Sequence, residues 1–310
     1  MNSMACEILC LGEPLGEFSQ LEPDRFRFGY GGDVANVAVA AVRAGAKAGI
    51  VTRLGQDWVG DALVDFWQAE GVGSVVEADP SASTGLYFIR YNQFGHSFDY
   101  LRAGSAASRM DPSLLKEVDW DAVKILHVSA ISQAISRSAL ETVARAISIA
   151  TERGIVISYD TNLRLKLWSL EEARKSVINT LSTANVALPS LDDAKLLFGQ
   201  DDPVALVDKF LEFGADIVAM TLGADGVLVA TAKMKHHLPA HEVDVLDASG
   251  AGDCFDGYFL TRYLECNDLL SAARFANAAS ALTVMRRGAV SAIPFRADVT
   301  RFLERANRND

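Results

Sequence analysis

Asp247-Ala248-Ser249-Gly250-Ala251-Gly252-Asp253 is the most informative stretch of the chain, and it stands directly before an apolar run from Cys254 to Leu264 that predicts an amphipathic helix. A glycine turn that opens a helix leaves backbone N–H groups unpaired at the positive end of the helix dipole, which suits a phosphate oxygen. A carboxylate beside a phosphate repels it, unless the carboxylate takes a proton from an attacking hydroxyl. The spacing therefore predicts either a kinase site with Asp253 as the base or an ordinary helix start with an aspartate in its first turn.

Other phosphate-binding patterns are missing from the chain. No Gly-x-x-x-x-Gly-Lys-Ser/Thr segment occurs, and no Gly-x-Gly-x-x-Gly segment follows the first predicted strand. A P-loop NTPase and a conventional dinucleotide-binding fold both lose support, so a nucleotide would be held by another kind of loop.

Size and hydropathy are those of a soluble enzyme. The 310 residues suffice for one large α/β domain or two smaller ones with a substantial core. Half of the residues are apolar, yet no stretch approaches the roughly 18 consecutive apolar residues of a membrane span. The first residues, Met-Asn-Ser-Met-Ala-Cys-Glu, lack a basic region followed by an apolar run, so we expect no secretory signal and a cytoplasmic location.

Charge and cysteine spacing narrow the classes of partner. With 40 acidic and 29 basic residues the net charge is -11, which argues against nonspecific binding to nucleic acid or to an anionic membrane. Cysteines at 6, 10, 254 and 266 show no Cys-x-x-Cys spacing and no histidine partner pattern, so neither a zinc site nor a disulfide framework is indicated. An anionic nucleotide would then need Mg2+ and a local cluster of hydrogen-bond donors.

Short apolar runs alternate with helical patterns along the chain. Buried strands are predicted at 8–11, 49–52, 123–128, 155–158, 186–188 and 217–220. Helices are predicted at 35–44 with Gly45 as the stop, at 136–152, and at 170–184 with a Ser169 cap and Glu172 three residues later. This alternation predicts an α/β fold with right-handed crossovers and a largely parallel sheet covered on both faces.

One segment breaks this alternation. Residues 85–91 and 96–102 are alternating, aromatic-rich strands joined by Asn92-Gln93-Phe94-Gly95, which predicts a β-hairpin. Together with residues 18–30 the hairpin would form a small sheet outside the main one. Because no repeat or linker is visible, we expect a single domain over 1–310, with lid segments at about 14–31 and 84–104 inserted into the α/β core.

Two arginines suggest a substrate with a carboxylate. Alternation places Tyr100 and Arg102 on one face of a strand, and Arg164 follows a strand end, where α/β proteins usually bind ligands. Arginine offers a carboxylate a planar bidentate fork, which a neutral sugar does not need. The alternative is that both are surface arginines in salt bridges, which is the usual fate of the residue.

Two signatures resemble those of the ribokinase-like (PfkB) carbohydrate kinases. The stretch from Asp247 to Phe255 is similar to the family's Asp-Thr-x-Gly-Ala-Gly-Asp-x-Phe, and Gly31-Gly32-Asp33-Val34-Ala35-Asn36 matches its Gly-Gly-x-x-x-Asn. The resemblance runs from about residue 7 to 294. It implies a three-layer α/β/α fold with a small β-sheet lid over the sugar, and an ATP- and Mg2+-dependent kinase. It also implies an anion hole at Gly250, Ala251 and Gly252, with Asp253 as the catalytic base.

The resemblance further implies a nucleotide site. The loop from Thr221 to Val227 resembles the family's ATP-side loop, and Asn277 stands where the family has an adenine-side residue. From the residues alone, the loop would be interpreted as an ordinary turn, and Asn277 would be interpreted as a solvent-facing residue or a helix cap. The cofactor-binding residues implied are Asn162, Ser190, Thr221, Gly223, Gly226 and Asn277.

The chain departs from the family after the strand near residue 189. Family members usually carry Asn-x-x-Glu there, a motif tied to Mg2+ and phosphate positioning, whereas this chain has Ser190-Leu191-Asp192-Asp193. Ser190 can still form a hydrogen bond, and Asp193 can act on the metal indirectly through bound water, although its side chain is one methylene shorter than Glu. The metal assignment is correspondingly weaker.

The lid motifs are most similar to those of 2-keto-3-deoxygluconate kinases. They are Gly-Leu-Tyr-Phe-Ile, Tyr-Leu-Arg-Ala-Gly-Ser-Ala-Ala and Asn-Leu-Arg-x-x-Leu-Trp. In that branch the residues that match Gly32, Asn36, Tyr87, Tyr100, Arg102 and Arg164 contact the sugar acid. Glu17 is a weaker candidate near the sugar hydroxyls.

These motifs predict phosphorylation of the primary hydroxyl of a sugar acid, 2-keto-3-deoxygluconate in the first place, to its 6-phosphate. A fructokinase or other neutral-ketose kinase is the alternative, since such enzymes share the glycine motifs and match the lid less well. A catalytically silent sugar or nucleotide sensor is disfavoured because Asp253 and its glycines are intact. The expected partners are the sugar acid, ATP and further copies of the chain, because the apolar lid faces could pair across a two-fold axis.

Overall fold

A nine-stranded sheet forms the centre of the computed structural model, which describes residues 6–92 and 95–306. From one edge to the other its strands are β13 (Met234–Leu238), β12 (Val227–Thr231), β11 (Ile217–Thr221), β10 (Val186–Ala187), β9 (Val156–Asp160), β8 (Ile125–Ser129), β1 (Ile8–Leu11), β4 (Ala48–Gly55) and β5 (Gly73–Asp79). Only β12 pairs antiparallel to its neighbours β11 and β13. The expected α/β fold with a mostly parallel sheet is confirmed.

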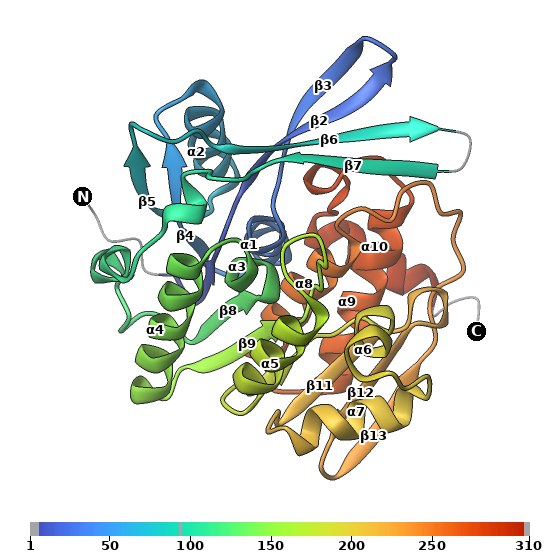
Figure 1. Cartoon of the computed structure of the whole chain (residues 1–310). Helices are drawn as coiled ribbons and strands as arrows, with labels where there is room; N and C mark the ends of the chain where they lie inside the picture. Colours follow the sequence, from blue (N-terminus) through green and yellow to red (C-terminus); the bar gives the residue numbers. More distant parts are fainter. Residues whose placement is uncertain (1–5, 93–94, 307–310) are drawn as a thin grey trace.

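Helices cover both faces of this sheet (Figure 1). One face packs against α1 (Asp33–Ala44), α2 (Trp58–Glu70), α8 (Ala251–Cys266), α9 (Leu269–Val284) and α10 (Arg296–Ala306). The other face packs against α4 (Arg137–Arg153), α5 (Leu170–Leu181), α6 (Leu191–Phe198) and α7 (Pro203–Glu212). Short helical turns complete the chain: α3 (Ala130–Ala134), η1 (Ala107–Arg109), η2 (Pro112–Glu117), η3 (Gly223–Asp225) and η4 (Val290–Ala292).

The helix ends follow the capping residues of the sequence. Gly45 ends α1 in the left-handed conformation, as predicted. Ser169 and Glu172 form a full capping box at the start of α5. That helix ends at Leu181 rather than at residue 184, because the chain tightens after Thr180 and turns into β10.

The prediction of an amphipathic helix after residue 253 is wrong for its first half. All residues from Cys254 to Thr261 are buried, since α8 lies between α1 and α9. Gly257 permits this arrangement: a Cβ there would lie 2.6 Å from the carbonyl oxygen of Val37 and 2.8 Å from the nitrogen of Ala41. The base motif is therefore built on a helix inside the core, which fixes its position rigidly.

The second sheet is the expected lid. Its strands are β2 (Leu15–Glu22), β3 (Arg25–Gly31), β6 (Gly85–Asn92) and β7 (Gly95–Leu101), in the order β3-β2-β6-β7. Figure 1 shows this sheet standing apart from the main one, across the top of the molecule in that view. The predicted hairpin is β6–β7, and residues 93–94 of its turn lie outside the described residues.

The helices and the cysteines were also checked for a membrane span and for disulfide bonds. Within residues 6–92 and 95–306, no helix combines the length and apolarity needed to cross a bilayer. The cysteines are free thiols: Cys6, Cys10 and Cys254 are buried, and Cys266 is exposed.

Candidate active site

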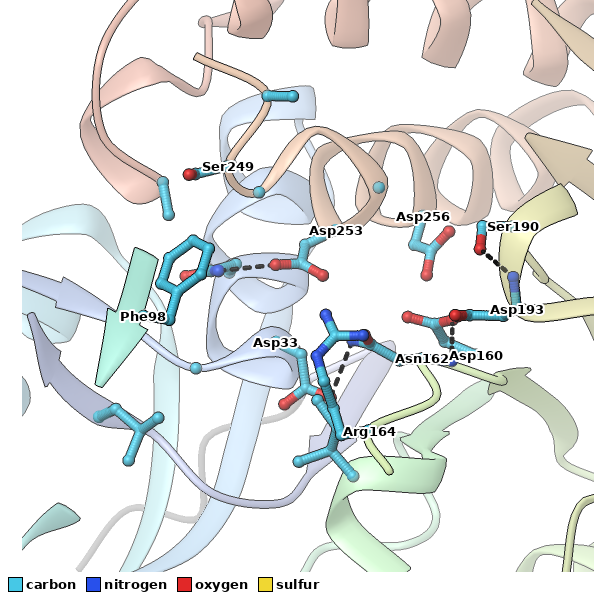
Figure 2. A pocket seen from close by; sticks show the side chains of 18 of the residues that line it. Asp33, Phe98, Asp160, Asn162, Arg164, Ser190, Asp193, Ser249, Asp253 and Asp256 are labelled. Atoms are coloured by element: carbon cyan, nitrogen blue, oxygen red, sulfur yellow. Dashed lines mark hydrogen bonds between the residues drawn. The ribbon is translucent and has the colours of Figure 1, made fainter. Parts of the chain in front are cut away.

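A cavity of about 530 Å³ lies between the lid, the carboxyl ends of the central strands and the start of α8. Figure 2 shows side chains from these elements converging on it. Most of the residues that the sequence singles out line this cavity: Gly32, Asn36, Tyr87, Tyr100, Arg102, Asn162, Arg164, Ser190, Asp193, Thr221, Gly250, Gly252 and Asp253. Residues more than 200 positions apart thus meet at the edge where parallel strands end, which is the usual ligand site of such sheets.

Four of the predicted site residues do not line the cavity. Ala251 donates its backbone N–H to Ala248 O, 3.3 Å away. Asn277 donates to the carbonyl oxygen of Pro239 at 2.7 Å, and so ties α9 to the loop before the base motif. Gly223 and Gly226 belong to the turn between β11 and β12.

Gly226 has a structural requirement of its own. Its φ of +96° and ψ of -127° are accessible essentially to glycine alone. A Cβ there would lie 2.1 Å from the carbonyl oxygen of Leu238. A glycine is therefore required at this position so that the end of β13 can pack beside the start of β12, and this requirement does not depend on a ligand.

Asp253 lies in the first turn of α8, with Gly250 as the N-cap in the left-handed conformation. Asn36 Nδ2 donates to Asp253 Oδ2 at 2.7 Å, across 217 residues of sequence. Burial raises the pKa of Asp253 to about 7, helped by the negative charge of Asp33 and opposed by the Asn36 hydrogen bond and by Arg164. A carboxylate with a pKa near neutrality is suited to accept a proton at physiological pH.

The glycines beside Asp253 keep the approach to it open. A Cβ at Gly252 would meet no atom within 4 Å, so this position borders free space in the cavity. The first N–H groups of a helix have no intrahelical acceptor. Because the N–H of Ala251 is already bonded, the donors left at this end that could bind an anion are those of Gly252 and Asp253.

Four further carboxylates line the cavity that sequence reasoning did not assign: Asp33, Asp160, Asp192 and Asp256. Asp160 ends β9 and accepts a hydrogen bond from the backbone N–H of Asn162 at 2.9 Å. Burial raises the pKa of both Asp160 and Asp256 well above the usual range, and neighbouring carboxylates raise both further. Two sequence features could have identified two of these residues. Asp160 stands at a predicted strand end, and Asp256 follows Asp253 by three residues, which places Asp253 and Asp256 on one face of the helix.

Ser190 and Asp193 mark the start of α6. The Ser190 hydroxyl caps this helix by accepting the N–H of Asp193 at 3.1 Å. Asp193 Oδ2 accepts the backbone N–H of Leu163 at 3.0 Å, which anchors the loop that carries Arg164. Burial raises the pKa of Asp193, while this N–H and the charge of Arg164 lower it.

The lid contributes aromatic side chains and a buried acid. Tyr87 hydrogen-bonds Glu17 through its hydroxyl and stacks on Tyr100, with ring centroids 5.9 Å apart. Glu17 is buried and accepts a second hydrogen bond from Ser19 at 2.6 Å. It does not line the cavity, so its contact is with Tyr87. Asn36 Oδ1 is buried and has no hydrogen-bond partner among the described residues, which leaves an acceptor for a ligand hydroxyl.

The two arginines differ in their surroundings. Arg102 forms an ion pair with Glu13, whose carboxylate is fully buried and also accepts a hydrogen bond from Ser105. Arg164 is exposed at the cavity and donates to the Leu163 carbonyl oxygen at 2.8 Å. In the part of the chain that is described, no carboxylate lies within ion-pair distance of Arg164, so its charge is available to a ligand.

The oxygen atoms that line the cavity suit a metal ion held partly by the protein and partly by a bound substrate. Among the described residues, no three His, Cys, Asp or Glu side chains are grouped closely enough to hold a metal ion by themselves. Mg2+ prefers oxygen ligands and is usually held by one or two carboxylates, water and substrate phosphates. The buried Asp256 Oδ2, which has no hydrogen-bond partner within the described ranges, fits such a shared site.

Comparison with known proteins finds similar carbohydrate kinases. The model of the pfkB family carbohydrate kinases matches residues 7–296. A 2-dehydro-3-deoxygluconokinase from Thermoproteus tenax is 34% identical over 299 residues, which cover 93% of this chain and 91% of that protein. Fructokinase-1 from Oryza sativa subsp. japonica is 31% identical over 320 residues, covering 96% and 98%. A crystal structure of an E. coli protein assigned as a ribokinase II, in complex with ATP and Mg2+, has a TM-score of 0.88 at 25% identity and covers 97% and 99%.

Proposed function

This chain belongs to the pfkB family of carbohydrate kinases and is an ATP-dependent phosphotransferase, and from that premise we propose that its acceptor is a sugar acid. The proposed substrate is 2-keto-3-deoxygluconate, also called 2-dehydro-3-deoxygluconate, phosphorylated on its primary hydroxyl. A relative that is 34% identical carries that name, which supports the proposal.

Arg164 is the observation that carries this proposal. Its guanidinium stands exposed at the cavity, on the loop that follows β9, and it pairs with no carboxylate of the described residues. A planar guanidinium binds a carboxylate through two parallel hydrogen bonds, and a neutral ketose offers no such partner. In this proposal Arg164 binds the sugar carboxylate, Arg102 lies beside it, and Tyr87, Tyr100 and Gly32 border the sugar.

The proposed chemistry is assigned to Asp253. Its carboxylate accepts the proton of the sugar hydroxyl as the hydroxyl oxygen forms a bond to the γ-phosphorus, and the bond to ADP breaks. Asn36 holds Asp253 by the 2.7 Å hydrogen bond and offers Oδ1 to the sugar. The N–H groups of Gly252 and Asp253 stabilise the charge on the transferring group.

The nucleotide is assigned to the other side of the cavity. We propose that Asn162, Ser190 and Thr221 line the ATP phosphates, that the turn with Gly223 and Gly226 borders the nucleoside, and that Asn277 acts through the loop it holds. Bound Mg2+ would neutralise charge on the phosphates. Asp193 would act on it through water, because one of its oxygens is occupied by the Leu163 N–H.

A neutral-ketose kinase remains the second candidate, on one observation. The charge of Arg102 is already neutralised by Glu13, so only one arginine is left for a substrate carboxylate. Fructokinases are also nearly as similar, as the 31% identity to the rice enzyme illustrates.

An ADP-release assay with Mg-ATP separates the two candidates. With 2-keto-3-deoxygluconate, fructose and ribose at equal concentrations, we expect kcat/KM to be highest for the keto acid by at least about tenfold, the discrimination of one charge-assisted hydrogen bond. Replacing Arg164 by Gln should remove most of that preference while activity on fructose changes little. Preference for fructose in the unmodified protein would reject the sugar acid and keep the kinase.

We also propose that the chain forms a homodimer through the outer face of the lid. Tyr100 points into the cavity, so its neighbour Leu101 points to the opposite face, where it is 65% exposed. Phe18 and Phe88 stack on that face with centroids 5.1 Å apart, beside Trp58, which is 60% exposed. Such an apolar face is typical of a protein interface.

Light scattering tests the dimer. We expect the unmodified protein to have twice the chain mass and Leu101→Glu to have the monomer mass, because a charge would be buried at the interface. Leu196→Glu is the matched control, since Leu196 is 53% exposed on α6, away from the lid. A monomeric unmodified protein, or a dimeric Leu101→Glu variant, would reject this interface.

A further inference from the structure

Arg43 is a largely buried arginine whose hydrogen bonds link three segments of the chain. It lies in the last turn of α1, and 8% of its side chain is exposed. Its Nε and Nη2 donate to the two carboxylate oxygens of Glu70, the last residue of α2, at 2.8 and 2.7 Å. Its Nη1 donates to the carbonyl oxygens of Val290 and Ile293 at 2.9 and 2.7 Å. The guanidinium therefore holds η4 against the ends of α1 and α2.

The two bonds to carbonyl oxygens distinguish Arg43 from an arginine that only forms an ion pair. A charged donor gives a stronger hydrogen bond than a neutral one, and the planar guanidinium holds its donors in a fixed geometry. The same segment is held from its other side by α8, because the Tyr258 hydroxyl donates to the carbonyl oxygen of Pro294 at 2.7 Å. Residues 290–294 are thus bonded to both α1 and α8.

The segment that Arg43 holds borders the glycine turn before Asp253. Ala289 directly precedes η4 and lines the cavity. It packs over Gly250, the N-cap of α8, since a Cβ on Gly250 would lie 3.1 Å from both the Cα and the Cβ of Ala289. One residue earlier, the N–H of Gly288 donates to Asp247 Oδ2 at 3.0 Å. A shift of this segment would therefore move the glycine turn with it.

We propose that Arg43 is a positioning residue for phosphoryl transfer. By holding η4 it keeps Ala289 against Gly250, and so keeps the N–H groups of Gly252 and Asp253 directed at the transferring phosphoryl group. This inference rests on the proposed role of those N–H groups. Arg43 itself does not line the cavity, so it acts through the turn and contacts neither substrate.

The competing explanation is that Arg43 stabilises the fold and has no effect on catalysis. Such a role would come mainly from the ion pair with Glu70, because a largely buried charge without its partner is destabilising. Positioning depends on the two carbonyl bonds instead. A displacement of catalytic groups by about 1 Å can lower a rate by about 10²-fold. Donors that act on the transition state change kcat more than KM.

Steady-state ADP release by the full chain separates the two roles. The substrates are Mg-ATP and whichever of 2-keto-3-deoxygluconate and fructose the protein prefers. Arg43→Met removes all four hydrogen bonds and should lower kcat by about 10- to 100-fold, while both KM values change by less than about threefold. Rates are measured well below the melting temperature of each variant, so that unfolded protein does not contribute to the loss.

Glu70→Gln is the matched control. It removes the charge of the ion pair and leaves both bonds from Arg43 to the carbonyl oxygens. Urea unfolding should show a loss of stability, because the buried guanidinium loses its counter-charge, while kcat stays within about twofold of the unmodified protein.

Ala289→Gly tests the route from Arg43 to Gly250. It removes the methyl group that packs over Gly250 and leaves the bonds of Arg43 in place, so kcat should fall by about threefold or more. The double variant Arg43→Met/Ala289→Gly should lose no more turnover than Arg43→Met alone, because both changes act on the same contact.

Four results would overturn the proposal: a normal kcat in Arg43→Met, an equal loss of kcat in Glu70→Gln, an unchanged kcat in Ala289→Gly, or losses that multiply in the double variant. The Ala289→Gly result decides the matter even if Arg43→Met does not fold. Asp253→Asn separates this inference from the proposed reaction. If Asp253→Asn loses turnover and Arg43→Met keeps it, only the role of Arg43 is rejected; if Asp253→Asn keeps turnover, the assignment of the base fails independently of Arg43.

Discussion

Replacement of Asp253 by Asn is expected to lower kcat by about 10²-fold or more, the usual contribution of a general base. The KM values for ATP and the sugar should change little, because Asn has the same shape and only the proton acceptor is lost. Steady-state ADP release measures both quantities. Near-normal turnover would show that Asp253 is not the base.

Two measurements control for a trivial loss of activity. Asp61→Asn makes the same chemical change at an exposed position of α2 and should keep full turnover. In addition, Asp253→Asn should raise the melting temperature at pH 8. The folded-state pKa of about 7 lies above the usual aspartate value, so the ionised carboxylate costs stability as pH rises through that range. A variant that loses both turnover and stability would instead indicate disrupted packing.

The pH profile follows from the same pKa. A base must be unprotonated, so kcat/KM should increase from about pH 6 and level off above the pKa of about 7. The residual activity of Asp253→Asn should lack this inflection. A profile that is flat between pH 6 and 8 in the unmodified protein would contradict the assignment, provided that the chemical step limits the rate.

Local sequence motifs predicted those parts of the fold and the site that are determined by the conformation of neighbouring residues, such as helix ends. The glycines before Asp253 indicated a helix start, and Gly250 does cap α8. The capping residues Gly45 and Ser169 placed helix ends, because capping involves only neighbouring residues. The meeting of Asn36 with Asp253 was predicted only through the resemblance to a family, since nothing local links residues 217 positions apart.

The sequence did not indicate the roles of residues outside the motifs, because only folding brings these residues to their partners. Glu13 lies in the loop between β1 and β2, and only the fold brings it to Arg102. Asp256 reads as one more polar residue of a helix predicted to be amphipathic, whereas the packing of α8 between α1 and α9 makes it a buried acid. Gly226 was assigned to the nucleotide site only through the resemblance, and nothing in the motif indicated that its own turn also requires a glycine.

Replacement of Arg102 by Ala is expected to cost about 3–5 kcal/mol of folding free energy, because it leaves the fully buried Glu13 carboxylate without its partner. The destabilisation should be smaller at pH 5.5 than at pH 8. Burial already raises the pKa of Glu13 and Arg102 is the main influence that lowers it, so the pKa rises further without Arg102 and protonation removes the charge at the lower pH. Urea unfolding at the two pH values measures this difference.

A double-mutant cycle separates this structural role from the proposed role in sugar binding. Glu13→Gln keeps the shape and the acceptor for Ser105 but removes the charge, so Arg102→Ala should cost clearly less stability in that background. If Arg102 also binds the sugar acid, KM for 2-keto-3-deoxygluconate should rise about tenfold or more in both backgrounds, while KM for ATP changes little. Two results would contradict a role of Arg102 in sugar binding: an equal increase in KM for the sugar and for ATP, or an increase in KM for the sugar that disappears in the Glu13→Gln background. In either case Arg102 would only hold the lid onto the core, and Arg164 would be the sole carboxylate anchor.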